Sequence, residues 1–582
     1  MLKPDLNFIS KPLQNTEISV SSKKLMIACL ALILLVFTDV EQLFAQSRPL
    51  NVTGGVTMSA RAYQVSGIDG RRAPLSATTN GNLQFDLFGL KTGLNLTYTT
   101  EESRLRQSVN RLSFDTSWSW GSFSAGDVSP DLGRFMLQGS TVRGGFTRGN
   151  VGNWMYDFTT GQSRKAVGFN ADLPFTSTSF QRMLYAGRIG YGDQNANHLK
   201  IGSMYARDVA GSINDPGSET PSENLVITTE GGLHLFENRL KINAQLSTSA
   251  LNRDFRNPVA SESSLPGIMN SLFNAREGHS FNLAGEGQLR IELPSFTLNS
   301  QYSRIDPGYE SLGLRNVIND QESFSIQPVF QLFDRRLSVS MNYQYGRNNL
   351  DNQRQSTLSR TQMGINLTGR ATENITITAG YNRMGNLNKP VSDLVNPIQI
   401  QLDYLMHSLM FAPSVVIQQG DFSHSITLSG AYQFSDDRSL AVQEGIRPGR
   451  DQDIYTSNLA YMLRFPSGFS INTSGNFVRS DTNNSLTTSY GINAGSGIQF
   501  LENKLNLNIN LGWAANSTEF SSRDLDVKRA AEQFIASTAL SYRITGKTSL
   551  RLQSRGLVNR MKQGDGQAFR EFQTEVFLSH KF

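Results

Sequence analysis

The chain has 582 residues, a formal net charge of +5 and a hydrophobic content of 38%. That content is too low for a bundle of membrane-spanning helices beyond the N-terminal region, and the scattered basic residues argue against nucleic-acid binding. Fifty glycines and abundant Asn, Ser and Thr favour strands and turns. Transmembrane barrels escape the hydropathy test, because half of each strand faces a polar lumen.

The N-terminal region has the layout of a secretory signal peptide. Lys23 and Lys24 precede an apolar run over 25–37, and a small residue, Ala45, follows Leu43 and Phe44 at a cleavage position. We therefore expect residues 1–45 to be a signal peptide with a polar leader over 1–22, and residues 46–582 to be the exported protein. The only cysteine, Cys29, lies in the apolar run, so the mature protein would form no disulfide.

The first part of the exported chain, 46–223, has shorter and less regular strand patterns than the rest. Strand-like sequence begins at Val52, so we expect no compact plug domain before the barrel pattern. Further strands are expected over 82–88, 93–99, 109–118, 122–128, 141–147, 154–160, 166–173, 179–190 and 199–207.

One unusual segment lies in this part of the chain: Gly-Asp-Val-Ser-Pro over 126–130, then Phe135, Gly139 and Val-Arg-Gly-Gly over 142–145. It is similar to a pattern in the early barrel of fimbrial ushers, which export pilus subunits, but the chain lacks the soluble domains and cysteines of ushers. If the resemblance is functional, Arg143 and Arg148 are lumen or loop cations. The alternative, which we prefer, is a glycine-rich loop and strand.

From 224 to 582 the pattern becomes a series of regular hairpins. A short turn segment recurs over 236–240, 332–337 and 500–505, and it is followed each time by a strand in which apolar and uncharged polar residues alternate. We expect the polar face to line a lumen, with candidate lumen residues Lys241, Gln344, Thr376, Asn506, Asn508 and Asn510. Aromatic residues near the strand ends are candidates for a girdle at the membrane interface: Tyr343, Tyr345, Tyr381 and Trp513.

Turn spacing predicts the architecture. Short turns are expected near residues 294, 334, 373, 421, 467, 503 and 546, and long polar loops over 252–278, 306–321, 384–396, 435–453 and 516–529. Short periplasmic turns and long extracellular loops are the known asymmetry of outer-membrane barrels. With seventeen strands from residue 224 onward and nine or ten before it, we predict an all-β, antiparallel transmembrane barrel of about 26 strands, with a range of 22–28. A set of soluble β-sandwiches is the structural alternative.

The C-terminal segment, 568–582, alternates strictly and ends in an aromatic residue. It resembles the closing strand of a bacterial outer-membrane β-barrel, a family whose last residues are read by the barrel-assembly machinery. That resemblance implies an assembly signal formed by Phe572, Val576, Leu578 and Phe582. It also implies that outer-membrane lipid and lipopolysaccharide are partners.

The sequence carries no local signature of catalysis. Its six histidines include no pair at metal-ligand spacing, and neither a G-x-S-x-G elbow nor a phosphate-binding loop is present. His424, between Ser423 and Ser425, is the one candidate for a site assembled from separate strands. We therefore expect no cofactor, no metal and no enzyme activity.

A plug-less barrel of this size would enclose a wide lumen. The first functional hypothesis is a channel or translocation conduit in the outer membrane, for solutes or an exported polymer, working alone or with a periplasmic or surface partner protein. The second is a structural or adhesive surface protein with a blocked bore. An outer-membrane enzyme is the third.

Overall fold

The structure is a computed structural model that describes residues 51–87, 90–100, 110–168, 178–316, 318–391, 401–439, 450–522 and 525–582. The compact unit described below runs from Val52 to Phe582. The expected signal peptide and its cleavage site lie outside the described residues.

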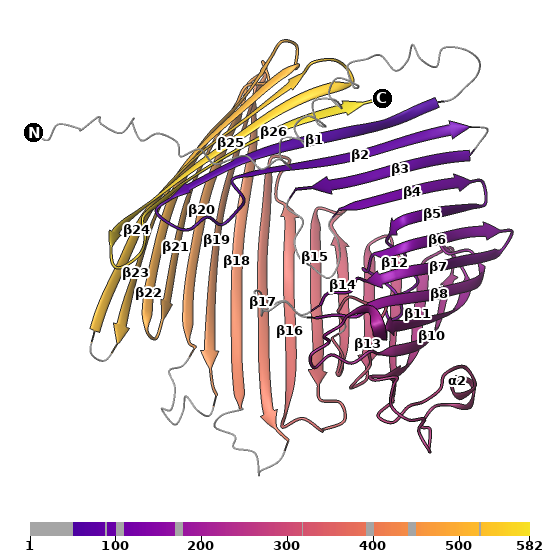
Figure 1. Cartoon of the computed structure of the whole chain (residues 1–582). Helices are drawn as coiled ribbons and strands as arrows, with labels where there is room; N and C mark the ends of the chain where they lie inside the picture. Colours follow the sequence, from indigo (N-terminus) through magenta and orange to yellow (C-terminus); the bar gives the residue numbers. More distant parts are fainter. Residues whose placement is uncertain are drawn as a thin grey trace, which may run out of the picture. The chain divides into compact units, whose positions relative to one another are not determined.

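Twenty-six antiparallel strands form one sheet whose first and last strands pair, so the sheet closes into a barrel. Nine strands precede Glu223: β1 (Asn51–Ser66), β2 (Leu75–Leu87), β3 (Leu90–Thr99), β4 (Arg111–Trp118), β5 (Gly121–Val128), β6 (Val142–Val151), β7 (Trp154–Arg164), β8 (Gln181–Gly192) and β9 (His198–Val209). In Figure 1 these strands are drawn from indigo to magenta.

Seventeen strands follow: β10 (Glu223–Leu235), β11 (Leu240–Asn252), β12 (Ser280–Leu293), β13 (Phe296–Ile305), β14 (Gln321–Leu332), β15 (Leu337–Asn348), β16 (Ser356–Arg370), β17 (Ile375–Pro390), β18 (Leu402–Gln419), β19 (Phe422–Asp437), β20 (Gln452–Arg464), β21 (Ser470–Thr482), β22 (Ser485–Phe500), β23 (Leu505–Ser522), β24 (Leu525–Arg543), β25 (Thr548–Gln563) and β26 (Phe569–Lys581). The all-β barrel and its strand number are confirmed. The strand expected over 166–173 is wrong in its described part, where Val167 forms only an isolated bridge with Ser179.

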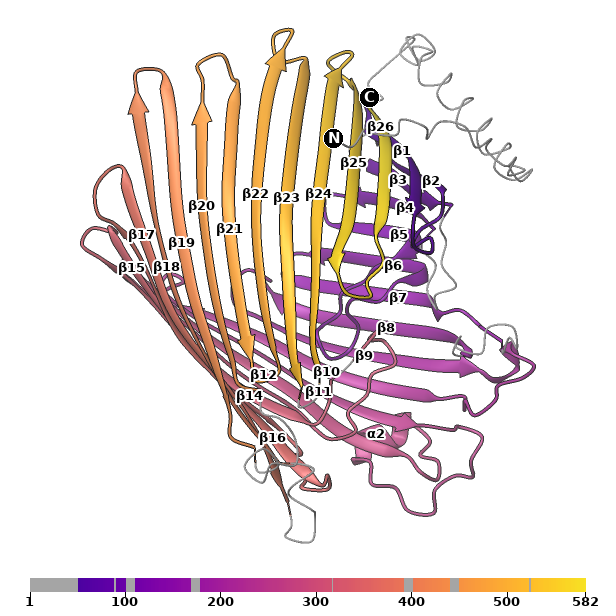
Figure 2. The ribbon, with the colours of Figure 1, turned by 90° about the vertical axis from the view of Figure 1, so that its left-hand side faces the viewer.

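The barrel closes where β26 lies beside β1, as Figure 2 shows. The register runs from Gly55 opposite Lys581 to Ser66 opposite Arg570, and the Phe582 amide donates a hydrogen bond to the Gly54 carbonyl at 3.1 Å. Because the number of antiparallel strands is even, the start of β1 and the last residue of β26 lie at the same end of the barrel. In the described part of the chain, two short helices, a 3-10 turn (Ala210–Ser212) and α2 (Gly267–Leu272), lie in loops, and no helix there is long and apolar enough to cross a membrane.

The three recurring turn segments share one backbone conformation. Each has three consecutive non-glycine residues with positive φ, at 236–238, 333–335 and 501–503. Each is closed by a hydrogen bond from the fourth residue's amide to the first residue's carbonyl, 3.0 to 3.1 Å long. The internal repeat read from the sequence is therefore a repeat of structure, and all seven short turns expected after residue 224 join consecutive strands.

The long loops are partly shorter than expected. Loops occupy 253–279 and 306–320, but β17 continues to Pro390, and β23 and β24 run to Ser522 and from Leu525. These polar ends remain in the sheet because their backbone groups pair, as in Thr518 opposite Arg529. The change to polar sequence therefore does not mark the end of the strand there.

Side chains alternate strictly between the two faces of the wall. On β9, Lys200, Gly202, Met204 and Ala206 are buried on the inner face, whereas Leu199 and Ile201 are more than half exposed on the outer one. Large apolar side chains are exposed in the same way around the outer face, as at Leu246, Leu459, Ile492 and Leu511. One sector of this face is covered by the 253–279 loop, in which Met269 and Phe273 form an apolar cluster with Leu225 and Ala250.

Candidate functional site in the barrel lumen

The loop between β5 and β6, residues 129–141, folds into the barrel and is called the inner loop below. Leu132, Phe135, Met136 and Leu137 in this loop are almost completely buried. The loop is compact because it bonds to itself: the Leu132 amide donates to the Leu137 carbonyl at 2.9 Å, and the Leu137 amide donates to Gly133 at 3.1 Å. Gly133 has a φ of 116°, a conformation that favours glycine.

An apolar layer of the inner wall receives this loop. Leu132, Met136 and Leu137 belong to one buried cluster with side chains of the strands and loops around them: Val128, Val142, Leu184, Ala186, Met204, Ala206, Val226, Leu251 and Leu312. The wall residues of this cluster lie in the half of each strand that is nearer to the barrel end at which the inner loop connects β5 to β6. Burial of this much apolar surface inside a lumen holds the loop against the wall.

The loop between β13 and β14, residues 306–320, packs over the inner loop and is called the covering loop. The Tyr309 hydroxyl donates to the Phe135 carbonyl at 2.8 Å, and the Ser311 hydroxyl donates to the Met136 carbonyl at 2.7 Å. Tyr309 is fully buried, and this burial raises the pKa of its phenol above the usual value. Asn224 of β10 fixes the covering loop in turn by accepting from the Leu312 amide at 3.1 Å.

A row of charged side chains, called the charged ladder below, crosses the inner wall. It lies beyond the apolar layer, farther from the strand ends that the inner loop connects. The ladder begins with Arg148 of β6, which is directly paired with Asp157 of β7 and forms an ion pair of 2.5 Å with it. Asp157 is in turn directly paired with Arg188 of β8, and this ion pair is 2.8 Å long. Arg188 also reaches Glu230 of β10 at 2.8 Å, and Lys200 of β9 reaches the same carboxylate at 3.1 Å. Opposite charges on neighbouring strands stabilise one another in this arrangement.

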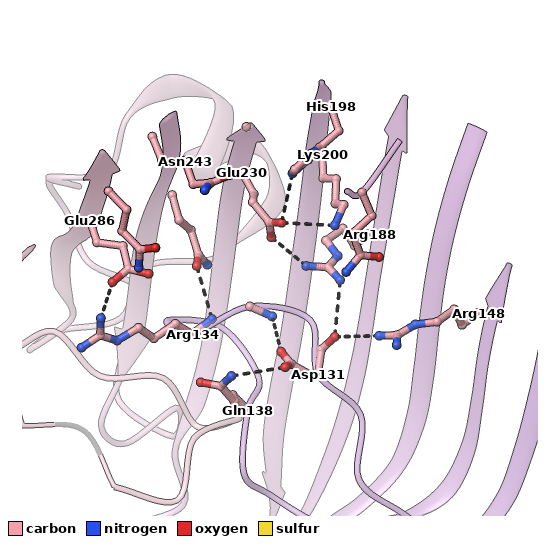
Figure 3. A pocket seen from close by; sticks show the side chains of 16 residues that line it. Asp131, Arg134, Gln138, Arg148, Arg188, His198, Lys200, Glu230, Asn243 and Glu286 are labelled. Carbon is pink, nitrogen blue, oxygen red and sulfur yellow. Dashed lines mark hydrogen bonds and ion pairs between the residues drawn. The ribbon is translucent and has the colours of Figure 1, made fainter. Parts of the chain in front are cut away.

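The inner loop is fastened to this ladder, as Figure 3 shows. The Asp131 carbonyl accepts hydrogen bonds from Arg148 at 3.1 Å and from Arg188 at 3.4 Å. Arg134 forms an ion pair with Glu286 of β12, and its amide donates to Gln245 of β11 at 3.3 Å. The charges of the ladder are already paired with one another. The uncharged Asp131 carbonyl can therefore attach the loop to the ladder without an additional ion pair.

Two polar cavities lie along the inner wall, and the first of them lies beside the inner loop. One has a volume of about 380 Å³ between the loop and the charged ladder, and it is lined by Asp131, Arg134, Lys200 and Glu286 among others. The other, of about 520 Å³, lies further along β11 to β14. No group of three or more metal-type ligands exists among the described residues. The arrangement can narrow a bore and can bind a polar ligand.

The structure places the candidate lumen residues on one face of the sheet. Lys241 lines the second cavity, as does Ser325, which is directly paired with Gln344. Following directly paired residues from β15 to β23 puts the remaining candidates on that same face: Thr376, Asn506, Asn508 and Asn510. They are spread around the barrel from β11 to β23.

The candidate girdle residues lie on the opposite, outer face. Tyr343 is paired with Ile326 and Met363, and Trp513 with Ile492 and Phe534. The Tyr381 hydroxyl is 2.8 Å from His407 Nδ1, and Tyr345 is paired with Phe324.

The residues expected to form an assembly signal are located at the barrel seam. Phe572, Val576 and Leu578 share the outer face of β26, paired with Gly556, Leu552 and Leu550 of β25. Phe582 follows the last strand residue, Lys581.

The structure does not bring the remaining candidate residues together in one site. His424 bonds to Tyr461 across the outer face at 3.0 Å, whereas Ser423 and Ser425 alternate to the inner face, so the three do not meet. Arg143 pairs with Asp127 at 2.8 Å, and Arg148 belongs to the charged ladder.

Sequence reasoning missed the inner loop's role as a lumen element. A signal was present, because Leu132, Phe135, Met136 and Leu137 form an apolar cluster within a stretch bounded by glycines, and such a cluster is unfavourable in a solvated loop.

No protein-family model and no curated protein matches the chain. Several solved structures are similar in fold. A P pilus tip assembly intermediate from E. coli that contains PapC is 11% identical, with 93% of this chain and 63% of that chain covered and a TM-score of 0.44. The FrpB iron transporter from Neisseria meningitidis is 8% identical, with 94% and 83% covered and a TM-score of 0.39.

OccAB4 from Acinetobacter baumannii is 12% identical, with 66% of this chain and 97% of that chain covered and a TM-score of 0.29. At these identities the likeness is one of fold alone. The chain is a large closed antiparallel β-barrel with large apolar side chains exposed on its outer wall and an inner wall that is polar apart from the apolar layer that receives the inner loop.

Proposed function

We propose that this protein is a conduit in the bacterial outer membrane whose bore is narrowed on one side by the inner loop and the covering loop. An exposed apolar outer face needs lipid around it, and a closed barrel leaves no strand edge unpaired in the membrane. A barrel of this strand number is wider than those that already leave an aqueous channel. The cargo is a solute or an exported polymer.

One observation carries the proposal: on the inner wall, buried apolar side chains occur in one sector. The apolar wall residues that pack against the inner loop and the covering loop come from strands no further along the chain than β13, and among the described residues no apolar side chain beyond Val339 is buried. On β23, Asn508 and Asn510 are exposed on the same face that packs against the inner loop elsewhere in the barrel. The wall from β16 to β25 therefore presents an accessible polar surface, as a water-filled passage requires.

The inner loop is a constriction inside the bore and not part of the wall. It is held by the apolar cluster, by the Asp131 carbonyl and by the Arg134–Glu286 ion pair. It is also held by hydrogen bonds from Tyr309 and Ser311 of the covering loop. Opening therefore needs a partner or cargo whose binding offsets the loss of these contacts. A partner or cargo that displaces the loop would widen the bore.

The test is conductance in planar lipid bilayers. The purified mature barrel is compared with a variant lacking residues 131–138 of the inner loop and with a control lacking residues 256–263 of the loop on the outer face. Stepwise current that rises in the first variant alone supports the conduit. Silence of all three folded proteins contradicts it and favours the structural or adhesive alternative with a blocked bore.

A further inference from the structure

A row of uncharged polar side chains crosses six strands of the inner wall beside the inner loop. Asn243 of β11 is directly paired with Gln288, which is paired in turn with Gln301, Ser325, Gln344 and Gln362 on successive strands. Directly paired residues project from the same face as near neighbours. These six residues, Asn243, Gln288, Gln301, Ser325, Gln344 and Gln362, are called the amide ladder.

The amide ladder opens onto both cavities. Asn243 and Gln288 line the cavity at the inner loop, and all but Gln344 and Gln362 line the second cavity of about 520 Å³. Other amide side chains add to that second cavity, namely Gln194, Asn195, Asn299 and Gln327. Figure 3 places Asn243 between Glu230 and Glu286, next to the wall that the inner loop covers.

Most of these amides have no hydrogen-bond partner in the described part of the chain. Among the described residues, only Gln301 of the ladder's amides forms a side-chain hydrogen bond, donating to Glu286 at 3.1 Å. Asn243, Gln288, Gln344 and Gln362 form none with the described part of the chain. Each amide offers two donors and one acceptor oxygen, so the ladder presents a dense set of both kinds to the lumen.

The charges beside the ladder lie in a separate row of paired residues. Lys241 and Arg290, the two basic residues (Lys or Arg) among the described residues that line the second cavity, are directly paired with each other, and both reach Glu292, at 3.3 and 2.5 Å. The two cations share this one carboxylate, so this row keeps one net positive charge. The six ladder residues carry no charge, so the ladder itself offers a ligand hydrogen bonds and no ion pair.

We propose that the amide ladder binds a neutral, polyhydroxylated ligand of the saccharide class; the proposal rests on the conduit function and names its cargo. Each hydroxyl group is both a donor and an acceptor, which matches an amide row without a formal charge. Among the described residues, no Phe, Tyr or Trp lines the second cavity. The site therefore lacks a stacking surface and binds weakly, with a Kd on the order of 1 mM, which permits release during transport.

The experiment measures the block of ionic current by added oligosaccharides. Maltohexaose and chitohexaose are the neutral probes, and a hexamer of galacturonate is the acidic one. The ladder variant carries Gln288→Ala and Gln301→Ala, and the matched control carries Asn472→Ala and Asn493→Ala on β21 and β22, two exposed amides of the same inner face. A neutral probe should block the native protein and the control alike, and its apparent Kd should rise about 10-fold in the ladder variant.

Saturation-transfer NMR on the detergent-solubilised proteins measures binding whether or not current flows. A barrel that conducts ions but binds neither neutral probe overturns the saccharide proposal and leaves the conduit standing. Binding of a neutral probe without current does the reverse. Binding of the galacturonate hexamer alone, or equal losses in the ladder variant and the control, also overturns the assignment to a neutral ligand on this ladder.

Discussion

Met136 of the inner loop lies directly against Gly202 of β9. A Cβ placed on Gly202 would approach the Met136 Cε to 3.2 Å, and the Met136 side chain is completely buried. Gly202 is itself on the inner face of the wall. A position without a side chain on β9 therefore gives the loop the space it occupies.

Gly202→Val should displace the inner loop. The added side chain crowds Met136 and also Thr228 and the Gly187 carbonyl of the wall, both 3.1 Å from the added Cβ, and overpacking of this kind costs about 1–3 kcal/mol. That cost raises the fraction of open loop roughly 10-fold, which appears as larger or more frequent current steps in planar bilayers. Gly287→Val is the control, because a Cβ at Gly287 meets nothing within 4 Å. Identical conductance of the two folded variants would contradict the assigned contact.

The Arg134–Glu286 ion pair should respond to charge exchange. Arg134→Glu and Glu286→Arg each replace attraction by repulsion, so openings become more frequent in both single variants, and the double variant restores the pair. The Arg134 side chain is 45% exposed, so the pair contributes at most about 1 kcal/mol and the change is about 5-fold or less. The difference should shrink in 1 M salt, which screens the pair. Additive effects in the double variant would exclude a direct interaction.

The barrel itself could be predicted from the sequence, because alternation and turn chemistry are local. The strand after the third turn segment, with Leu505, Leu507 and Ile509 on one side and Asn506 and Asn508 on the other, forms β23. The turn segments at 236–238, 333–335 and 501–503 adopt one conformation. Local signals of this kind fix the register of a hairpin independently of the rest of the chain.

The lumen site could not be predicted in the same way. The inner loop has no periodicity, and whether Leu132 or Met136 is buried depends on β8, β9 and β10, which are distant in sequence. The ladder from Arg148 to Arg188 appears only when β6, β7 and β8 are placed in register. The polar sequence at the ends of β23 and β24 predicts a loop, but the structure has strands there. Composition indicates the surroundings of a side chain, whereas backbone pairing decides where a strand ends.

The three recurring turns predict a reciprocal effect on stability. The last left-handed residue is Asn238, Arg335 or Asn503, with φ of 66° to 67°. Asparagine tolerates this conformation better than arginine, so Arg335→Asn should stabilise the barrel by about 0.5–1 kcal/mol and Asn503→Arg should destabilise it by a similar amount. Urea midpoints for folding into lipid vesicles provide the measurement. Changes of the same sign would show that the side chains, and not the backbone, decide the effect.

Adjacent residues on β20 test which face meets lipid. Leu459 is 53% exposed on the outer face, and Asn458 is paired with Asn476 on the inner face. Leu459→Arg should cost about 2–4 kcal/mol when the protein folds into lipid vesicles, because an arginine near the bilayer centre loses its hydration. Asn458→Arg, the matched control, stays in the aqueous lumen and should change the urea midpoint little. An equal loss of folding free energy in the two variants would mean that the outer wall does not contact lipid. That result would contradict the proposal that the protein is a conduit in a membrane.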